Sequence, residues 1–141
     1  MKTMNVYRAF LFLLLASCAA LVHAESGVIV TGHPGLPQVD RAALMRLYTG
    51  RSIELAGKVV TVVNGAPGSA IRRQFLKAVV RMDEERYRAY WTVRRHVGKG
   101  VPPAELTPDE AVIAFVAATP DSIGYISVKS LTDGLNVIAR Y

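Results

Sequence analysis

Runs of β-branched residues mark the candidate strands of this chain. The first run covers residues 28–30 and ends in a loop rich in glycine and proline, which is typical of a strand followed by a turn. The second covers residues 58–63 and is too continuously apolar to alternate, so we expect a strand covered on both faces. Residues 123–128 and 135–139 are the last two strand candidates.

Helix starts are marked by residues that cap helices well. The predicted N-caps, all short polar side chains that can accept a bond from a first-turn amide, are Asp40, Ser69, Asp83 and Thr107. The helix from Asp40 is expected to run through Tyr48 and to stop at Gly50. Residues 107–110, Thr-Pro-Asp-Glu, have the form of a capping box with proline at the first helical position, and this helix is expected to end near Ala118.

The predicted order of elements is strand, helix, strand, three helices, strand, strand. Alternation of this kind favours an α/β domain in which helices pack on a small mixed sheet. Tyr87, Tyr90 and Trp91 recur at helical spacing within the third helix. We interpret them as a buried helix face rather than a platform for a ligand.

The N-terminus has the three zones of a secretory signal peptide. Lys2 and Arg8 supply the positive start, residues 9–20 the apolar run, and residues 22–24 (Val-His-Ala) a cleavage site with small residues on either side of the histidine. We therefore expect residues 1–24 to be a cleavable signal for export to the periplasm.

Two alternatives to cleavage stay open. The segment could remain as a membrane anchor, although its apolar run is short for a helix that must cross a bilayer. Lipidation at Cys18 is the other, because Leu-Ala-Ser-Cys at residues 15–18 resembles a lipobox. Apolar residues rather than a polar tether follow Cys18, so we favour cleavage.

Cleavage would change the length, the cysteine content and the net charge of the protein. Removing residues 1–24 from the 141 leaves 117, enough for one domain, 25–141, with a core of its own. The only cysteine leaves with the signal, so the exported domain cannot rely on disulfides. Lys2 and Arg8 leave as well, and the formal net charge falls from +6 to +4. This mild excess is compatible with anionic ligands, but solvated surface charge is the plainer interpretation.

The loop before the second helix is the strongest candidate for chemistry. An apolar strand leads through Asn-Gly-Ala-Pro at residues 64–67 to Gly68, Ser69 and Ala70. Unpaired amides in a first helical turn and the helix dipole favour an anion at such a place. Arg72 or Arg73 would add a positive charge one turn along. From the pattern alone the plainer interpretation is a capped turn, because most serine N-caps bind nothing.

Other chemistry has little support in the sequence. His33 and His96 have no metal-ligand spacing, so we expect no metal and no cofactor. No nucleophile, base and orienting group can be assembled, which argues against an enzyme. The sequence has no basic run with interleaved aromatic residues that would indicate a nucleic acid as partner.

Several segments, taken in order, resemble the phosphate-type periplasmic substrate-binding proteins of ABC transporters. Residues 44–51 (Leu-Met-Arg-Leu-Tyr-Thr-Gly-Arg) are similar to a helix end of that family. Residues 59–63 and Gly68-Ser69, with Arg73 and Phe75, are similar to its strand, serine-bearing loop and helix. Residues 90–103, from Tyr-Trp to Gly-Lys-Gly-Val-Pro-Pro, resemble its tryptophan and glycine-proline segment. Residues 119–126 (Thr-Pro-Asp-Ser-Ile-Gly-Tyr-Ile) resemble its threonine-proline ending.

The resemblance implies a single lobe of a type II periplasmic-binding-protein fold. It also implies an exported module that binds phosphate or another small oxyanion for an ABC permease. The loop pattern and the resemblance together predict Gly68, Ser69, Ala70 and Arg72 as the ligand-binding residues. Gly68 and Ser69 match the family's loop, whereas its arginine, aspartate, second glycine and threonine have no counterpart here. The alternative function is a protein of the same fold that binds no ligand and acts as an envelope interaction or sensor-accessory partner.

Overall fold

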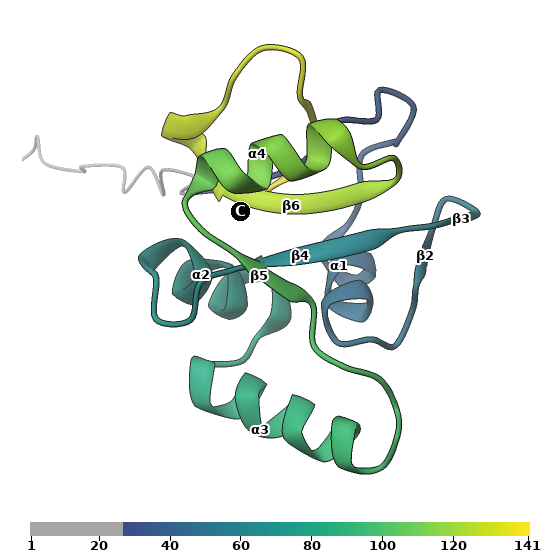
Figure 1. Cartoon of the computed structure of the whole chain (residues 1–141), viewed down its shortest axis with the longest axis vertical. Helices are drawn as coiled ribbons and strands as arrows, with labels where there is room; N and C mark the ends of the chain where they lie inside the picture. The colour runs from purple at the N-terminus through teal and green to yellow at the C-terminus, as the bar shows by residue number, and fades with distance from the viewer. Residues whose placement is uncertain (1–26) are drawn as a thin grey trace, which may run out of the picture.

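A mixed five-stranded sheet forms the centre of the protein (Figure 1). The structure is a computed structural model, and it describes residues 27–141. The strand order in the sheet is β5-β4-β6-β1-β7. Its strands are β1 (Gly27–Thr31), β4 (Thr61–Gly65), β5 (Ala104–Leu106), β6 (Ser122–Ser127) and β7 (Asn136–Arg140). A separate two-stranded hairpin consists of β2 (Glu54–Leu55) and β3 (Lys58–Val59).

Strand direction places three chain reversals at one edge of the sheet. β4 runs parallel to β5 and to β6, whereas β1 runs antiparallel to β6 and β7. The carboxyl ends of β4, β5 and β6 therefore lie at the same edge. The segments that follow β4 and β5 at this edge lead into helices, which is where ligands bind in many α/β sheets.

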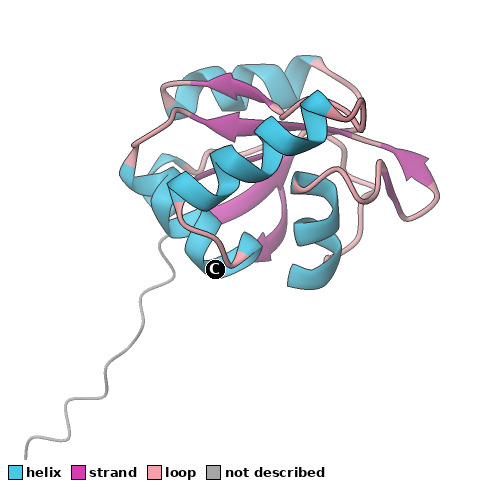
Figure 2. Ribbon diagram, turned by 90° about the horizontal axis from the view of Figure 1, so that it is seen from below, coloured by secondary structure: helices cyan, strands magenta, loops and turns pink. Residues whose placement is uncertain are grey.

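Helices cover both faces of the sheet (Figure 2). The helices are α1 (Arg41–Tyr48), α2 (Ala70–Phe75), α3 (Glu84–His96) and α4 (Asp109–Ala118), with a π-helical continuation of α2 at Leu76–Val80 and a short 3-10 turn at Val128–Ser130. On one face α4 packs on Val28 and Val30, and on the other α1, α2 and α3 pack around Ile29. Alternate residues of β1 thus enter two different cores, as strand geometry requires.

The end of α1 is held by the inner face of α3. The hydroxyls of Tyr87 and Tyr90 donate to the carbonyls of Tyr48 and Thr49, at 2.7 Å each. The guanidinium of Arg94 donates to the carbonyl of Gly50 at 2.9 Å. Three consecutive carbonyls at a helix end, which have no partner within their own helix, are satisfied in this way. The positive charge of Arg94 also suits the negative end of the helix dipole.

The predicted fold class, an α/β lobe with a small mixed sheet flanked by helices, is confirmed. Asp40, Ser69 and Asp83 cap their helices, each accepting a bond from the amide three residues on. The predicted capping box at Thr107 is wrong: α4 is preceded by Pro108 without a side-chain cap. The carboxylate of Asp109 instead accepts a bond from the amide of Ser127 at 2.9 Å, and so ties the start of α4 to the end of β6.

The single strand predicted for residues 58–63 is also wrong in its first half. Ala56 and Gly57 both have positive φ, and they make the two-residue turn that joins β2 to β3. Val59 in this hairpin is 62% exposed. The chain leaves the hairpin at Val60, whose amide bonds to the carbonyl of Ile53, and only then enters the sheet as β4.

The predicted signal peptide, its cleavage and the alternative at Cys18 fall within residues 1–26, outside the described residues, and stay predictions. Among residues 27–141 no helix has both the length and the apolar character needed to cross a membrane.

We expect Arg94→Met to lower the free energy of unfolding by about 1.5–3 kcal/mol, because it removes hydrogen bonds from a charged donor to two carbonyls. Arg95→Met is the matched control: this neighbour is exposed and makes no hydrogen bond through its guanidinium, so the change should stay within about 0.5 kcal/mol. Urea denaturation followed by circular dichroism measures both. Equal losses in the two variants would contradict the assigned role of Arg94.

Candidate functional site

The loop between β4 and α2 lies at the carboxyl edge of the sheet. Ser69 begins α2: its hydroxyl accepts from the amide of Arg72 at 3.3 Å, and its own amide donates to the carbonyl of Ala66 at 3.1 Å. Gly68, which is exposed, has φ +77 and has open space where a side chain would be. The amide of Ala70 lies in the first helical turn and has no acceptor within the helix. In this small turn Gly68 and Ala70 are exposed and Ser69 is half-buried, and the amide of Ala70 is a donor without an acceptor in the helix.

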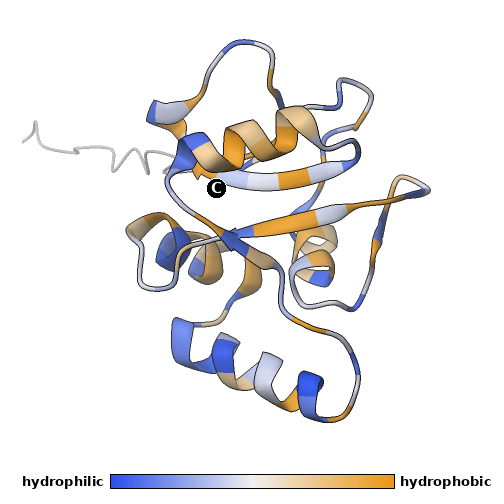
Figure 3. Cartoon of the chain, viewed as in Figure 1, coloured by the Kyte–Doolittle hydropathy of each residue, from blue (hydrophilic) through white to orange (hydrophobic). Residues whose placement is uncertain are grey.

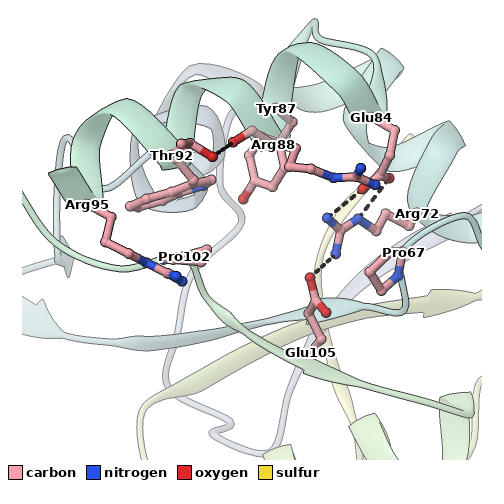
Figure 4. A pocket seen from close by; sticks show the side chains of 10 residues that line it. Pro67, Arg72, Glu84, Tyr87, Arg88, Thr92, Arg95, Pro102 and Glu105 are labelled. Carbon is pink, nitrogen blue, oxygen red and sulfur yellow. Dashed lines mark hydrogen bonds and ion pairs between the residues drawn. The ribbon is translucent and has the colours of Figure 1, made fainter.

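The side chain of Arg72 points away from that turn and into the protein. Its guanidinium forms a bidentate pair with Glu84 at 3.0 and 2.7 Å, and it donates to Glu105 at 2.8 Å and to the carbonyl of Gly65 at 2.9 Å (Figure 4). It also lies over the ring of Tyr87, 5.6 Å from the centroid. Arg72 is 4% exposed. The guanidinium joins β4, α3 and β5.

Two carboxylates therefore surround a single guanidinium. Burial alone would lower the pKa of Arg72, but hydrogen bonds to Glu105 and Glu84 outweigh it and the pKa is raised. The group is charged at every pH at which the protein folds. An incoming oxyanion would have to displace a carboxylate from Arg72, so the predicted role of this residue as a ligand donor gains no geometric support and stays a prediction.

Arg73, rather than Arg72, lies beside the loop, where the sequence predicted a positive charge from one of the two arginines. It is exposed, and its guanidinium donates to the carbonyl of Gly68. The charge nearest to the Gly68–Ser69 turn is therefore that of Arg73. Spacing along a helix could not separate the two neighbours, because their roles depend on glutamates that are distant in sequence from Arg72.

A chain of buried hydrogen bonds fixes the end of β4 beneath the loop. The hydroxyl of Tyr125 donates to the side-chain oxygen of Asn64 at 2.6 Å and accepts from the amide of Gly65 at 2.8 Å. The amide nitrogen of Asn64 donates to the hydroxyl of Tyr87 at 3.2 Å. None of these three side chains was singled out as a site residue from sequence. They position the loop and do not reach the surface.

Burial raises the pKa of Tyr125 above its ordinary value, and burial does the same for Tyr48, Tyr87 and Tyr141. These hydroxyls stay protonated in the folded protein at neutral pH. The hydroxyls of Tyr48, Tyr87 and Tyr125 act as hydrogen-bond donors or acceptors, whereas that of Tyr141 has no hydrogen-bond partner among the described residues.

A cavity of about 190 Å³ opens beside the Arg72 network, between α3 and the segment that leads into β5. Figure 4 shows Arg95 and Pro102 at one end and Arg72, Glu84 and Glu105 at the other. Arg88 and Arg95 contribute charges that pair with no carboxylate within 4 Å among residues 27–141. The remaining lining residues are Pro67, Tyr87, Trp91 and Thr92.

The histidines lie apart from this site. His33 is close to Asp121, at 3.9 Å, and to Lys58, near the amino ends of β4 and β6. His96 is exposed near the end of α3. Within residues 27–141 no three histidine, cysteine or acidic side chains come together in a way that could hold a metal ion.

Solved structures share this arrangement of strands and helices. A protein from Clostridium perfringens assigned as a phosphate ABC transporter substrate-binding protein, solved with bound phosphate, matches 80% of the chain with a TM-score of 0.61 and 16% identity. An ABC-type phosphate transport receptor from Vibrio cholerae matches 80% with a TM-score of 0.61 and 14% identity. PstS from Borrelia burgdorferi matches 81% with a TM-score of 0.59 and 15% identity.

The chain has the fold of one periplasmic-binding-protein lobe. It spans less than half the length of these proteins, covering 44%, 45% and 46% of them. No family model and no curated protein sequence matches the chain. At such low identities the likeness establishes the fold of the lobe alone.

We expect Arg72→Met to destabilise the lobe by about 3–5 kcal/mol, because it leaves two carboxylates and a carbonyl without their shared donor. Arg73→Met, one residue along on the exposed side, is the control and should cost less than about 1 kcal/mol. Chemical denaturation of both variants checks this. If the triple change Arg72→Met, Glu84→Gln, Glu105→Gln proved no more stable than Arg72→Met alone, unpaired charge would not be the cause.

The free energy of unfolding should fall as pH rises above about 10. Tyrosines in the unfolded chain lose their protons near that pH, whereas the four buried ones keep theirs in the folded lobe. The unfolded state then binds fewer protons than the folded state, and a further rise in pH stabilises it relative to the folded lobe. Urea titrations in steps from about pH 8 to about pH 11 measure the slope. Tyr125→Phe should make the fall shallower; an unchanged slope would show that Tyr125 contributes nothing to it.

Proposed function

We propose that this lobe is an exported solute-binding module that holds a small oxyanion, such as phosphate, at the turn formed by Gly68, Ser69 and Ala70. The observation that carries the proposal is the exposed first turn of α2 at the carboxyl edge of the sheet, with the guanidinium of Arg73 beside it. Amide donors and a nearby positive charge are what a phosphate or sulfate requires.

The role of Arg72 in this proposal is to position the turn. By binding the carbonyl of Gly65 and the two glutamates, it fixes the path of the chain from β4 into the loop. The positive charge that faces the ligand is then that of Arg73. Because the turn is exposed, the anion stays partly hydrated, and we expect weak binding that a second surface would strengthen.

The lobes of similar fold come from proteins described as parts of phosphate ABC transporters, which supports a transport role with a permease as partner. Export by the predicted signal peptide and location in the periplasm belong to the same proposal. The second candidate is an envelope interaction or sensor-accessory protein that binds no ligand. It is favoured by the exposed Val93 and Val97, which line one open hollow at the end of α3.

Isothermal titration with phosphate and with sulfate tests the proposed site. The unmodified protein should bind, Ser69→Asn should bind within about threefold of it, and Ser69→Asp should bind at least about tenfold more weakly. Asparagine and aspartate both cap helices as well as serine does, so only the added negative charge separates them. Melting temperatures of the two variants verify that the cap is kept.

The contribution of Arg73 is measured against a neighbour of equal charge. Arg73→Gln should weaken anion binding about fivefold, which is about the effect of one exposed charge near the ligand. Lys77→Gln, an exposed cation one turn further along the same helix, should change binding less than twofold. Absence of heat with every anion, together with an unchanged melting temperature, would overturn the proposed site and favour the second candidate.

A further inference from the structure

The outer side of α3 carries a concentrated positive charge. Four exposed cations lie on or just after this helix, whereas Arg94 points inward to the end of α1; the four are Arg86, Arg88, Arg95 and Lys99, of which Arg88 and Arg95 also line the cavity beside Arg72. In Figure 3 the helix stands at the outside of the molecule and is mostly hydrophilic. Within residues 27–141 no ion pair shorter than 4 Å involves Arg86, Arg88, Arg95 or Lys99. Of the nearby carboxylates, Glu84 and Glu105 are bound to Arg72, and Glu85 is exposed in the first turn of α3.

Exposed apolar side chains lie among these charges. Val93, Val97 and Val101 are 62%, 56% and 69% exposed. Val93 and Val97 are four residues apart and therefore adjacent on one side of the helix. Val93 and Val97 also line an open hollow of about 640 Å³ together with Thr92, Arg95 and His96. We call this surface the outer face of α3; it consists of Arg86, Val93, His96, Val97, Lys99 and Val101.

The inner side of the same helix explains why the outer face is fixed in place. Tyr87, Tyr90 and Arg94 are hydrogen-bonded to the end of α1, and Trp91 is buried. Its aromatic residues all belong to this inner side. The outer face is thus a preformed helical surface, which needs no ordering when it binds, with small apolar side chains and flanking cations.

We propose that the outer face of α3 docks on an anionic phospholipid surface. Positive charge that is spread along a helix and flanks an apolar strip is the pattern of helices that lie on membrane interfaces. Long arginine and lysine stems can cover the strip while their heads reach lipid phosphates. The proposal does not depend on the anion site at Ser69.

Flotation with lipid vesicles tests the docking. The full chain, as purified, is mixed with vesicles of phosphatidylglycerol and phosphatidylcholine in equal parts, or of phosphatidylcholine alone. It should bind the first more tightly than the second, and the difference should shrink as salt is raised toward about 0.5 M, because salt screens such contacts. Every variant carries the same N-terminal segment, so that any binding by this segment is common to all comparisons.

Two pairs of variants locate the contact. Arg86→Gln with Lys99→Gln should weaken binding to anionic vesicles about 20-fold, as expected for two charges near the lipid surface. Arg41→Gln with Arg46→Gln removes the same charge from exposed positions on α1 and should have less than about a threefold effect. Val93→Thr with Val97→Thr, which keeps shape and helix propensity, should weaken binding about fivefold. Val59→Thr, equally exposed on the hairpin, should not.

The results that would overturn the proposal are distinct from one another. Equal losses in the two arginine and lysine pairs would show attraction by net charge rather than docking by α3. Equal binding to both vesicle types would exclude an anionic surface. Self-association that Val93→Thr with Val97→Thr abolishes, or capture of an acidic protein without vesicle binding, would assign the face to a second copy or to a protein partner. Phosphate titrations of all these variants should match the unmodified protein, which separates this test from that of the anion site.

Discussion

The buried guanidinium of Arg72 is the contact on which the edge of the lobe depends. This single group donates hydrogen bonds to two carboxylates and one carbonyl. They belong to three elements that are distant in the sequence: the end of β4, the start of α3 and β5. A buried ion pair is weak as a source of stability, because desolvation of the charges offsets most of their attraction. It nevertheless specifies one arrangement of the three elements, because any arrangement that separates the partners leaves a buried charge without a counter-charge.

This geometry divides the positive residues of the lobe into two sets. Arg72 and Arg94 point inward, where glutamates or the carbonyls at the end of α1 bind them. Arg73, Arg86 and Arg95 lie on the surface, where no carboxylate of residues 27–141 pairs with them within 4 Å. The inner set holds α3 against the sheet. Only the outer set can meet a ligand or a surface, which is why adjacent arginines in the sequence have unrelated roles.

The sequence predicted the parts of the fold that local chemistry decides. Asp40, Ser69 and Asp83 cap their helices as predicted. Capping is a local interaction, because the short side chain bonds only to an amide in the first turn of its own helix. The hairpin at Ala56 and Gly57 was missed because alanine is an unusual residue at positive φ. Strand β5 is three residues long and is held by its pairing with β4 and by the bond from Arg72 to Glu105. No pattern within these three residues predicts such a strand.

In the candidate site, too, the sequence predicts local contacts but not those between distant residues. The turn at Ser69 follows from local sequence, but the partners of Arg72 lie 12 and 33 residues away, and only the fold brings Glu84 and Glu105 to it. Without those glutamates, Arg72 would be the natural ligand for an oxyanion. With them, the guanidinium is held by two carboxylates and the network has a net negative charge, so in the proposed site the anion would be met by the exposed turn and by Arg73. Of two arginines that are adjacent in the sequence, Arg72 is therefore part of the core and only Arg73 is available to the proposed site.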